Sequence, residues 1–285
     1  MQNKVGVILV NYHTVDDIVR IVNKYSAFSI ISNIVIVNND TLEKEKVQLD
    51  RIKSNKIHII YEKQNIGYSK GNNIGIKYLN KIGIDYVIIS NSDIDVDENT
   101  IINLVNDLSN NKKIGAIAPR MKNADGYLVP LRYIPLGYKR LFLQVFINNL
   151  DLKNEKKLLS DENGITIQSF LPGSFFICTM EALLKCEMFD PNVFLYREEE
   201  ILAKRLNEVG YLVGVDTHFS YVHNHQYNKE SLAKVIRGKN MEHKSERYYF
   251  KKYMNSNIIQ MLYVFIFECL YTLRWSIRHI IKNRG

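Results

Sequence analysis

Cysteine is scarce in this sequence, and the few cysteines present are badly spaced for cross-linking. The chain of 285 residues holds three of them, Cys178, Cys186 and Cys269, and no two lie in a Cys-x-x-Cys arrangement. A disulfide framework requires an even set of cysteines, and a zinc knuckle requires closely paired ones. The sequence therefore argues against both classes and indicates a reducing compartment.

Long apolar runs are also lacking near the N-terminus. The first run, Val5–Val10, holds six residues and ends at Asn11, whereas the apolar core of a secretory signal peptide spans roughly 7–15 residues. We therefore expect no export signal. Together with the cysteine pattern, this favours a protein that works in the cytoplasm.

The C-terminal apolar run is longer but still limited. Ile258–Leu273 holds sixteen residues, among them Gln260 and Glu268, and a helix needs about 20 apolar residues to span a bilayer. Tyrosine, tryptophan and basic residues lie in or beyond the run, a pattern typical of a membrane surface. We expect an interfacial helix here, and the alternative is a C-terminal core helix or the contact helix of a homodimer.

Positive charge is concentrated in the same region. The formal net charge of the chain is +8 at pH 7, and residues 229–285 hold twelve Lys and Arg against four Glu, so this segment carries the whole excess. A basic tail suits either nucleic acid or an anionic lipid surface. Because the basic residues flank an apolar helix and no nucleic-acid module is recognisable, we expect an anionic membrane surface as the partner, at the inner face of the cell membrane, and no nucleic acid.

In the first half of the chain, short apolar runs rich in β-branched residues alternate with segments of helical spacing. Strands that alternate with helices predict an α/β fold, with a mostly parallel central sheet flanked by helices. In such sheets, ligands lie beyond the carboxyl ends of the strands. The expected strands are Val5–Val10, Ile34–Val37, Ile57–Tyr61 and Tyr86–Ile89, and the expected helices are Val15–Tyr25 and Ile74–Lys81.

The second half of the chain is less regular. We expect an acceptor-binding half at residues 120–226 after a nucleotide-binding half at 1–119, followed by a basic helical extension at 227–285. Residues 120–164 are expected to form loops and short helices. The other expected helices are Glu98–Asn110, Met180–Cys186 and Ile201–Val209, and the other expected strands are Ile114–Pro119, Ile165–Thr179 with a break at Pro172, Tyr211–Val215 and His218–Val222.

Two carboxylates follow the fourth expected strand. Asp93 and Asp95 are two residues apart, and side chains with that spacing share a face of an extended chain. Together they are suited to one divalent cation such as Mg²⁺ or Mn²⁺, which prefers oxygen ligands and often completes its shell with substrate phosphates. The alternative is an acidic turn that caps the helix beginning near Glu98.

A glycine- and asparagine-rich run opens the helix after the third expected strand. Asn65–Gly75 allows close backbone approach, and a helix N-terminus with Lys70 favours negative charge. The run matches neither Gly-x-Gly-x-x-Gly nor the phosphate-loop pattern, so dinucleotide-binding and kinase-type functions lose their main support. A simple helix-capping loop is the local alternative.

Taken in order, these and further short motifs resemble family 2 glycosyltransferases of the GT-A fold, over roughly residues 4–226. The nearest likeness is to rhamnosyl- and galactofuranosyl-type transferases of bacterial surface polysaccharides. The motifs are Val10-Asn11-Tyr12, Val37-Asn38-Asn39-Asp40, the run from Asn65 to Asn73, Asn91-Ser92-Asp93, Gly173-Ser174-Phe175-Phe176, Phe189-Asp190 and Phe194-Leu195-Tyr196 followed by the acidic run at Glu198.

The resemblance implies an inverting, metal-dependent transfer of a sugar from a UDP- or dTDP-sugar to a saccharide or lipid-linked saccharide, in the synthesis of a capsule or O-antigen. It also implies a role for each matching residue. The nucleobase and ribose pocket would be lined by Asn11 and Asp40, and the rest of the nucleotide would contact Gly67, Lys70, Gly71, Asn72 and Asp93. The ligands of Mn²⁺ or Mg²⁺ would be Asp93, Asp95 and His223. The general base would be Glu199.

One departure from the family pattern concerns the acidic run. Relatives often carry a second carboxylate where this chain has Ile201, after Glu198, Glu199 and Glu200. Glu198 is therefore the alternative base. On local grounds the run also suits a solvated helix start, and a catalytically silent nucleotide-sugar-binding or membrane scaffold protein of the same fold is the alternative function.

Overall fold

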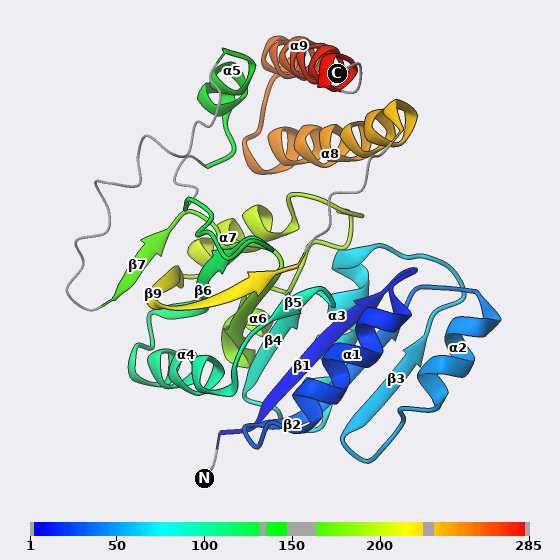
Figure 1. Cartoon of the computed structure of the whole chain (residues 1–285). Helices are drawn as coiled ribbons and strands as arrows, with labels where there is room; N and C mark the ends of the chain where they lie inside the picture. The colour runs from blue at the N-terminus through cyan, green and yellow to red at the C-terminus, as the bar shows by residue number, and fades with distance from the viewer. Residues whose placement is uncertain (1–2, 132–134, 147–163, 225–230, 283–285) are drawn as a thin grey trace.

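The computed structural model describes residues 3–131, 135–146, 164–224 and 231–282. In this part of the chain, a nine-stranded sheet is flanked by helices, and a group of C-terminal helices lies beside one edge of it (Figure 1). The strand order is β3-β2-β1-β4-β8-β6-β9-β5, with β7 paired to β9. The expectation of an α/β fold with a C-terminal helical extension is confirmed.

The first four strands form the predicted parallel part of the sheet. β1, β2 and β4 are buried along most of their length because helices cover both faces, whereas β3, at the end of the strand order, is only partly buried. On β1, Val5, Val7 and Leu9 join one apolar core and Ile8 joins the other, as alternation along a strand requires. The strands are β1 (Val5–Asn11), β2 (Ile31–Asn38), β3 (Ile57–Tyr61) and β4 (Tyr86–Ser90).

The helices of the body divide between the two faces of this sheet. Apolar residues of α1 (Val15–Ser26) and α4 (Glu98–Asn110) belong to one core. Those of α3 (Tyr68–Lys81), α6 (Met180–Lys185) and α7 (Glu198–Glu208) belong to the other. A further helix, α2 (Glu43–Asp50), was not expected from the sequence, because it buries only Glu45 and Leu49 and so lacks a continuous apolar stripe.

The second part of the sheet mixes strand directions. β8 (Phe175–Thr179) runs antiparallel to both β4 and β6 (Ile114–Lys122), whereas β6 and β9 (Leu212–His223) are parallel. The short strands β5 (Ile94–Asp95) and β7 (Ile165–Gln168) pair antiparallel with β9. The predicted parallel order therefore holds for β3, β2, β1 and β4, and antiparallel neighbours extend it.

β9 was expected as two short strands and is one continuous strand. The pairing register with β6 shifts between Pro119 and Arg120, whose partners are Asp216 and Ser220, so three extra residues lie on β9. Such an insertion bends a strand and increases its twist without ending it. Beyond the irregularity, β9 continues to His223, which lies opposite Ile94 of β5.

The C-terminal helices dock on the body through both apolar and polar contacts. A third buried cluster combines Ile201 of α7 with Tyr249 and Phe250 of α8 (Leu232–Tyr253) and Val264 of α9 (Ile258–Lys282). Leu141 of α5 (Tyr138–Phe146) joins them. Ile201, which follows the acidic run, therefore belongs to the apolar contact between body and extension.

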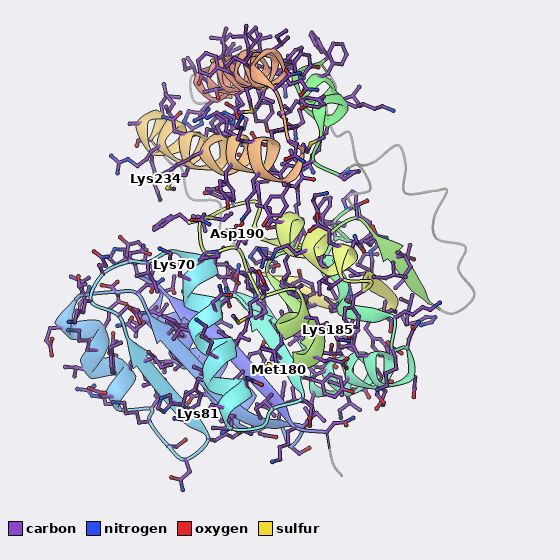
Figure 2. All side chains as sticks on the ribbon, turned by 180° about the vertical axis from the view of Figure 1, so that it is seen from behind. Lys70, Lys81, Met180, Lys185, Asp190 and Lys234 are labelled. Carbon is purple, nitrogen blue, oxygen red and sulfur yellow. The ribbon has the colours of Figure 1, made fainter. Side chains whose placement is uncertain are left out.

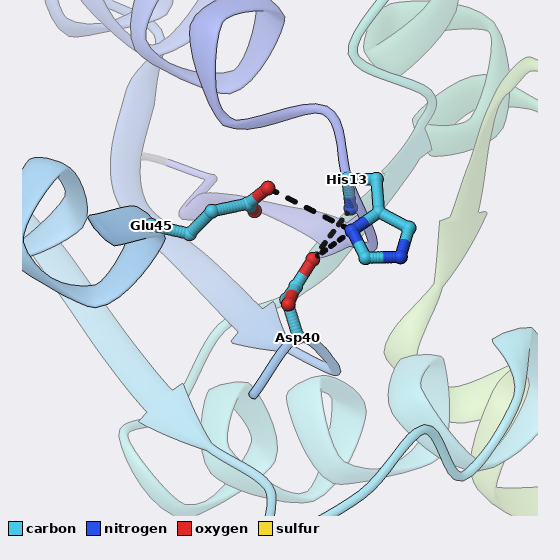
Figure 3. A group of neighbouring side chains, drawn as sticks. All are labelled: His13, Asp40 and Glu45. Carbon is cyan, nitrogen blue, oxygen red and sulfur yellow. Dashed lines mark hydrogen bonds and ion pairs between the residues drawn. The ribbon is translucent and has the colours of Figure 1, made fainter. Parts of the chain in front are cut away.

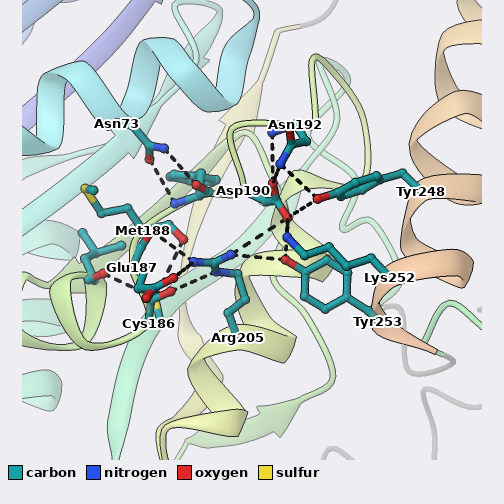
Figure 4. A network of polar contacts seen from close by, with 12 residues as sticks. Asn73, Cys186, Glu187, Met188, Asp190, Asn192, Arg205, Tyr248, Lys252 and Tyr253 are labelled. Atoms are coloured by element: carbon teal, nitrogen blue, oxygen red, sulfur yellow. Dashed lines mark hydrogen bonds and ion pairs between the residues drawn. The ribbon is translucent and has the colours of Figure 1, made fainter. Parts of the chain in front are cut away.

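Asp190 anchors α8 to the body on the polar side. It lies between the sheet domain and α8 (Figure 2). Tyr248, Lys252 and Tyr253 of α8 donate hydrogen bonds of 2.7–2.8 Å to one of its carboxylate oxygens (Figure 4). Burial alone would raise the pKa of Asp190, but these bonds outweigh it and hold the pKa far below its ordinary value.

α9 is longer than the sequence indicated. Its 25 residues extend to Lys282, and the stretch Ile258–Ile281 is long and apolar enough to cross a membrane by length and composition, with 11% of its 18-residue apolar window buried. The length argument against a membrane span was therefore wrong, because it ended the helix at Leu273. Isolated charges within the stretch, such as Arg274, did not end the helix.

Candidate active site

The pairing of β5 with β9 brings two of the predicted metal ligands together. Asp93 lies in the turn after β4, and His223 ends β9. The Nε2 atom of His223 is 3.2 Å from Oδ1 of Asp93, and both side chains are 23% exposed. The amide of Asn224 also donates a hydrogen bond to the carbonyl oxygen of Asp93. A carboxylate oxygen and an imidazole nitrogen thus lie side by side.

Asp95, the third predicted ligand, is not placed beside them. Its carboxylate forms an ion pair with Lys24 of α1. Asp93 and Asp95 were expected to share one face of an extended strand. Asp93 instead lies in a turn, and only Ile94 and Asp95 belong to β5. Among the described residues, Asp93, Asp95 and His223 do not form a group whose ligand atoms all lie within 4.8 Å. The assignment of Asp95 as a ligand stays a prediction.

The acidic run borders a cavity of about 490 Å³. Glu198 and Glu199 lie in the first turn of α7 and line this cavity together with His223. A Cβ atom at Gly173, also in the lining, would lie 3.3 Å from Cδ of Glu199, so the glycine leaves room for this carboxyl group. The structure therefore gathers both candidate bases and the candidate metal-binding histidine around one cavity.

The electrostatics of the two glutamates differ from those of exposed carboxylates. Removal from bulk water, with a smaller effect of neighbouring Glu199, raises the pKa of Glu198 to about 8. Oε2 of Glu198 is buried and has no hydrogen-bond partner among the described residues. Two adjacent carboxylates with little solvent resist simultaneous ionisation, so the pair holds a proton at neutral pH.

The predicted nucleotide loop lies against the segment that leads to these glutamates. Gly67 has a φ of +88°, and a Cβ atom there would lie 2.6 Å from the carbonyl oxygen of Phe194. The amide of Tyr68 donates a 2.8 Å hydrogen bond to the same oxygen. Only glycine combines this φ with such a close approach. The loop and the acidic run are therefore held in contact.

The other predicted loop residues occupy the first turn of α3. Gly71 and Asn72 are buried there, and Lys70 is exposed. A Cβ atom at Gly71 would lie 3.1 Å from the side chain of Val10 on β1, and Asn72 donates a hydrogen bond to the carbonyl oxygen of Tyr68. The hydroxyl of Tyr68 in turn donates to Asn91, which lines the cavity.

At the ends of β1 and β2, Asn11 and Asp40 are buried in a polar cluster. The side-chain amide of Asn11 donates to Asn38 at 2.7 Å and to Glu45 at 2.9 Å. Oδ2 of Asp40 accepts a hydrogen bond from the amide of His13 and lies 2.5 Å from its Nδ1 (Figure 3). Burial acts to raise the pKa of Asp40, but hydrogen bonds from the amides of Leu42 and His13 lower it overall.

The sequence did not single out His13 or Glu45. Together with Asp40, their ligand atoms lie within 4.8 Å of one another, a spacing that suits a metal ion. Both also border a cavity of about 710 Å³ lined by α1 and α2. His13 directly follows the Val10-Asn11-Tyr12 motif, so its place in the sequence could have identified it. Glu45 lies in the unexpected helix α2, and no sequence pattern marked it.

A family model agrees with the geometry over the larger part of the chain. The model described as glycosyl transferase family 2 matches residues 6–178, which include the end of β1, the nucleotide loop, Asp93 and Gly173. This chain belongs to glycosyl transferase family 2. No curated protein matches it in sequence.

Solved structures of glycosyltransferases share the GT-A fold of this family 2 member. The mannosyltransferase PcManGT from Pyrobaculum calidifontis, in complex with GDP-Man and Mn²⁺, superposes with a TM-score of 0.60 at 13% identity and covers 98% of this chain and 73% of its own. TarS 1–349 from S. aureus gives 0.54 at 12% identity, with 87% and 72% covered.

GalNAc-T7, solved with UDP, GalNAc and Mn²⁺, gives a TM-score of 0.58 at 14% identity. The match covers 83% of this family 2 chain but spans only 47% of the GalNAc-T7 chain. At these identities, the likeness establishes the fold, and substrates have to be argued from the site itself.

The side chains of the family 2 site fit a divalent cation. Asp93 and His223 offer one oxygen and one nitrogen ligand, and His223 faces the cavity that Glu199 lines. Mg²⁺ and Mn²⁺ usually take only a few protein ligands and complete their shell with phosphates and water. His225, a second candidate metal ligand two residues after His223 in the sequence, lies outside the described residues.

The cavity also includes a residue from beyond the expected catalytic region. Glu242 of α8 lines it, although the sequence placed residues 227–285 in a separate extension. The expected boundary at residue 226 stays a prediction. Sequence patterns alone did not mark Glu242, because it lies within a strongly charged helix.

Proposed function

We propose that this chain is an inverting, metal-dependent glycosyltransferase. It moves a hexose or related sugar from a UDP- or dTDP-linked donor onto a saccharide or lipid-linked saccharide, in the synthesis of a surface polysaccharide such as a capsule or O-antigen. The observation that carries the proposal is that Glu198, Glu199 and His223 line one cavity, with Asp93 against His223. The nucleotides in the similar solved structures, UDP and GDP-Man, support a donor of this class.

The reaction requires little covalent work from the protein. The acceptor hydroxyl loses its proton to a carboxylate, its oxygen bonds to the anomeric carbon, and the bond from that carbon to the phosphate oxygen breaks. Attack opposite the leaving group inverts the anomeric centre. A cation held by Asp93 and His223 would neutralise the negative charge that develops on the departing diphosphate.

We assign the base to Glu199 and keep Glu198 as the alternative. A general base must be ionised when the acceptor arrives. Because burial raises the pKa of Glu198 to about 8, Glu198 is protonated at neutral pH and is the weaker candidate for the base. The room that Gly173 leaves beside Glu199 supports the same assignment.

The test compares three variants with the wild type in the presence of Mn²⁺. A panel of nucleotide sugars is first screened for donor hydrolysis, and the best donor is then used for turnover. We expect Glu199→Gln to lower kcat by roughly 10²–10⁴-fold, the usual contribution of a general base. Glu198→Gln should have a smaller effect, and Glu208→Gln, on the same helix but outside the cavity lining, should change kcat less than threefold.

Each other outcome has a definite meaning. A larger loss in Glu198→Gln than in Glu199→Gln would transfer the base to Glu198. Equal background rates in the wild type and all variants would contradict the enzyme proposal and favour the silent nucleotide-sugar-binding protein. A rate that is unchanged by chelation and by added Mn²⁺ or Mg²⁺ would remove the metal.

We further propose that the enzyme acts at the inner face of the cell membrane, bound peripherally through α9. One face of this helix packs on the protein, where Val264 and Glu268 are buried. The opposite face carries an apolar stripe with helical spacing that remains exposed. Its members are Ile258, Leu262, Ile266, Leu270, Leu273, Ile277 and Ile281.

A lipid surface suits this face better than a membrane span does. The side of α9 that packs on α8 carries Glu268, which pairs with Arg247 of α8. If α9 crossed the bilayer, α8 would follow it into hydrocarbon together with exposed residues such as Lys234 and Lys244, at a cost of about 2.5–3.5 kcal/mol for each charge. An interfacial position leaves these charges near anionic headgroups instead.

Co-sedimentation with vesicles tests this assignment. We expect binding to vesicles with phosphatidylglycerol and little binding to pure phosphatidylcholine. Leu262→Glu with Ile266→Glu, both on the exposed stripe, should abolish binding, whereas Val47→Glu with Ile102→Glu, exposed apolar positions of the body, should not. Unchanged vesicle binding, or a dimer that the first pair converts to a monomer in sedimentation velocity, would instead favour a homodimer contact.

A further inference from the structure

The residues just before the acidic run have an unusual backbone. Tyr196 and Arg197 have φ values of +68° and +67°, the left-handed region that non-glycine residues rarely adopt. Two consecutive residues in this region persist only where the surrounding contacts determine them. Arg197 also serves as the N-cap position of α7, directly before Glu198 and Glu199. The contacts of Arg197 therefore fix the start of α7, where the two candidate bases lie.

The side chain of Arg197 is buried among carboxylates from two helices. Its Nη1 donates to Oε1 of Glu200 at 3.0 Å, and its Nη2 donates to Glu242 at 2.8 Å and to Glu246 at 2.5 Å. Glu200 accepts a second bond from Arg140 of α5. A guanidinium group presents several donors in a fixed plane, so these bonds specify an orientation and not merely a charge.

The segment is also held through its carbonyl groups. The hydroxyl of Ser245 on α8 donates a 2.7 Å hydrogen bond to the carbonyl oxygen of Leu195. On the opposite side, the amide of Tyr68 donates to the carbonyl oxygen of Phe194. Residues 194–197 therefore connect the nucleotide loop with α8, and Arg197 supplies most of the bonds toward α8.

α8 is itself fixed by α9 at the same place. Oε2 of Glu246 lies 2.9 Å from Nδ1 of His243, within hydrogen-bond distance. Nε2 of the same imidazole lies 2.8 Å from the hydroxyl of Thr272 on α9. A continuous series of polar contacts therefore runs from α9 through His243 and Glu246 to Arg197. It ends at the first turn of α7.

We propose that Arg197 is a positioning residue that ties Glu198 and Glu199 to α8 and α9. The C-terminal hairpin formed by these two helices is then a part of the active site as well as a surface for lipid. The proposal rests on the proposed function for its kinetic consequence only. Because Arg197 also borders the cavity, the competing role is direct contact with the donor. That role would appear in the donor KM, whereas positioning of the base appears in kcat.

The experiment uses the full chain and four proteins: the wild type, Arg197→Gln, Arg197→Lys and Arg205→Gln. Arg205 is the matched control, because it lies on the same helix and also bonds α8, through Tyr253, without lining the cavity. Hydrogen–deuterium exchange of the amides of Tyr68 and Ile201, which donate to the carbonyl oxygens of Phe194 and Arg197, is measured first and requires no substrate. Turnover of the best donor with Mn²⁺ then gives kcat and KM.

We expect Arg197→Gln to raise exchange at the amides of Tyr68 and Ile201 at least tenfold while β1 and β4 stay protected. Its kcat should fall about 100-fold with the donor KM within threefold, as expected when a reacting group is misplaced by about 1 Å. Arg197→Lys, which keeps the charge without the planar fork, should recover only part of the rate. Arg205→Gln should leave exchange at these two amides unchanged and kcat within threefold.

Unchanged exchange at the amides of Tyr68 and Ile201 in Arg197→Gln would overturn the proposal whatever the activity. A rise in donor KM without a loss of kcat would also overturn it and make Arg197 a substrate-binding residue. If the wild type turned over none of the donors, the proposed function would fail, and the exchange result would still decide whether Arg197 orders this segment.

Discussion

At the scale of single residues, the site depends on carboxyl groups kept in different states by their surroundings. Glu198 is removed from water and has its pKa raised to about 8, whereas hydrogen bonds lower the pKa of Asp40 and Asp190. The sequence identified Glu198, Glu199, Asp93 and His223 from ordered motifs. It did not reveal which carboxylates are paired, because partners such as His13 and Lys24 come from other elements.

The raised pKa of Glu198 predicts a pH dependence of stability. In the unfolded chain a glutamate titrates near about 4.3, so between that pH and about 8 the folded state holds one proton more. The free energy of unfolding should therefore fall as the pH rises through this window, by at most about 1.4 kcal/mol per pH unit from this group.

Urea unfolding of the wild type and Glu198→Gln at pH 5, 6, 7 and 8 measures this slope. The variant should lose the contribution of Glu198 and show a shallower decline. Burial also raises the pKa of Glu268 to about 7 and of Asp107 to about 6, so part of the decline should remain in both proteins. Identical slopes in the two proteins would mean that residue 198 is ionised throughout.

At the scale of elements, two short features decide the geometry of the site. The two-residue strand β5 pairs with the end of β9 and brings His223 to Asp93, and the irregularity opposite Pro119 lets β9 reach that far. A two-residue strand has too little pattern to be predicted from sequence. By contrast, β1 carries a continuous buried apolar run and α1 and α4 bury apolar residues at helical spacing, and their bounds, like those of β3, were predicted to within one residue.

The docking of α8 gives a prediction at this scale. Asp190→Asn would keep the shape of the side chain but remove the charge that Tyr248, Lys252 and Tyr253 address. Because hydrogen bonds to a buried charged group are worth about 1.5–3 kcal/mol each, we expect the free energy of unfolding at pH 7 to fall by about 2–4 kcal/mol.

Urea unfolding at pH 7 checks this value, with Asp50→Asn as the exposed control. The side chain of Asp50 is 53% exposed, so its loss should cost under about 1 kcal/mol. Since the pKa of Asp190 is lowered in the folded state, its contribution is present above the ordinary carboxyl pKa of about 3.9 and is lost as the pH falls below that value. A difference between Asp190→Asn and wild type that persists undiminished at pH 3 would contradict this assignment.

At the scale of the whole molecule, the family 2 body and its C-terminal hairpin are joined through the cavity lining, a buried apolar cluster and buried ion pairs. Glu242 lines the cavity, Ile201 lies in the apolar cluster under α8, and Arg197 is held mainly by α8. The same hairpin exposes the apolar stripe of α9. The proposed membrane contact and the candidate base are therefore separated by only two helices.

The sequence by itself determined the fold class and the family, and it nominated residues for the site, because apolar periodicity and ordered motifs are local properties of the chain. Only the tertiary structure decided that Asp93 meets His223 while Asp95 meets Lys24, and that α8 reaches the cavity. The physical reason is that a side chain's partners depend on strand register and helix docking, and these arise from contacts between residues far apart in sequence. Burial and pKa depend on those contacts in turn, so they could not be predicted from the motifs alone.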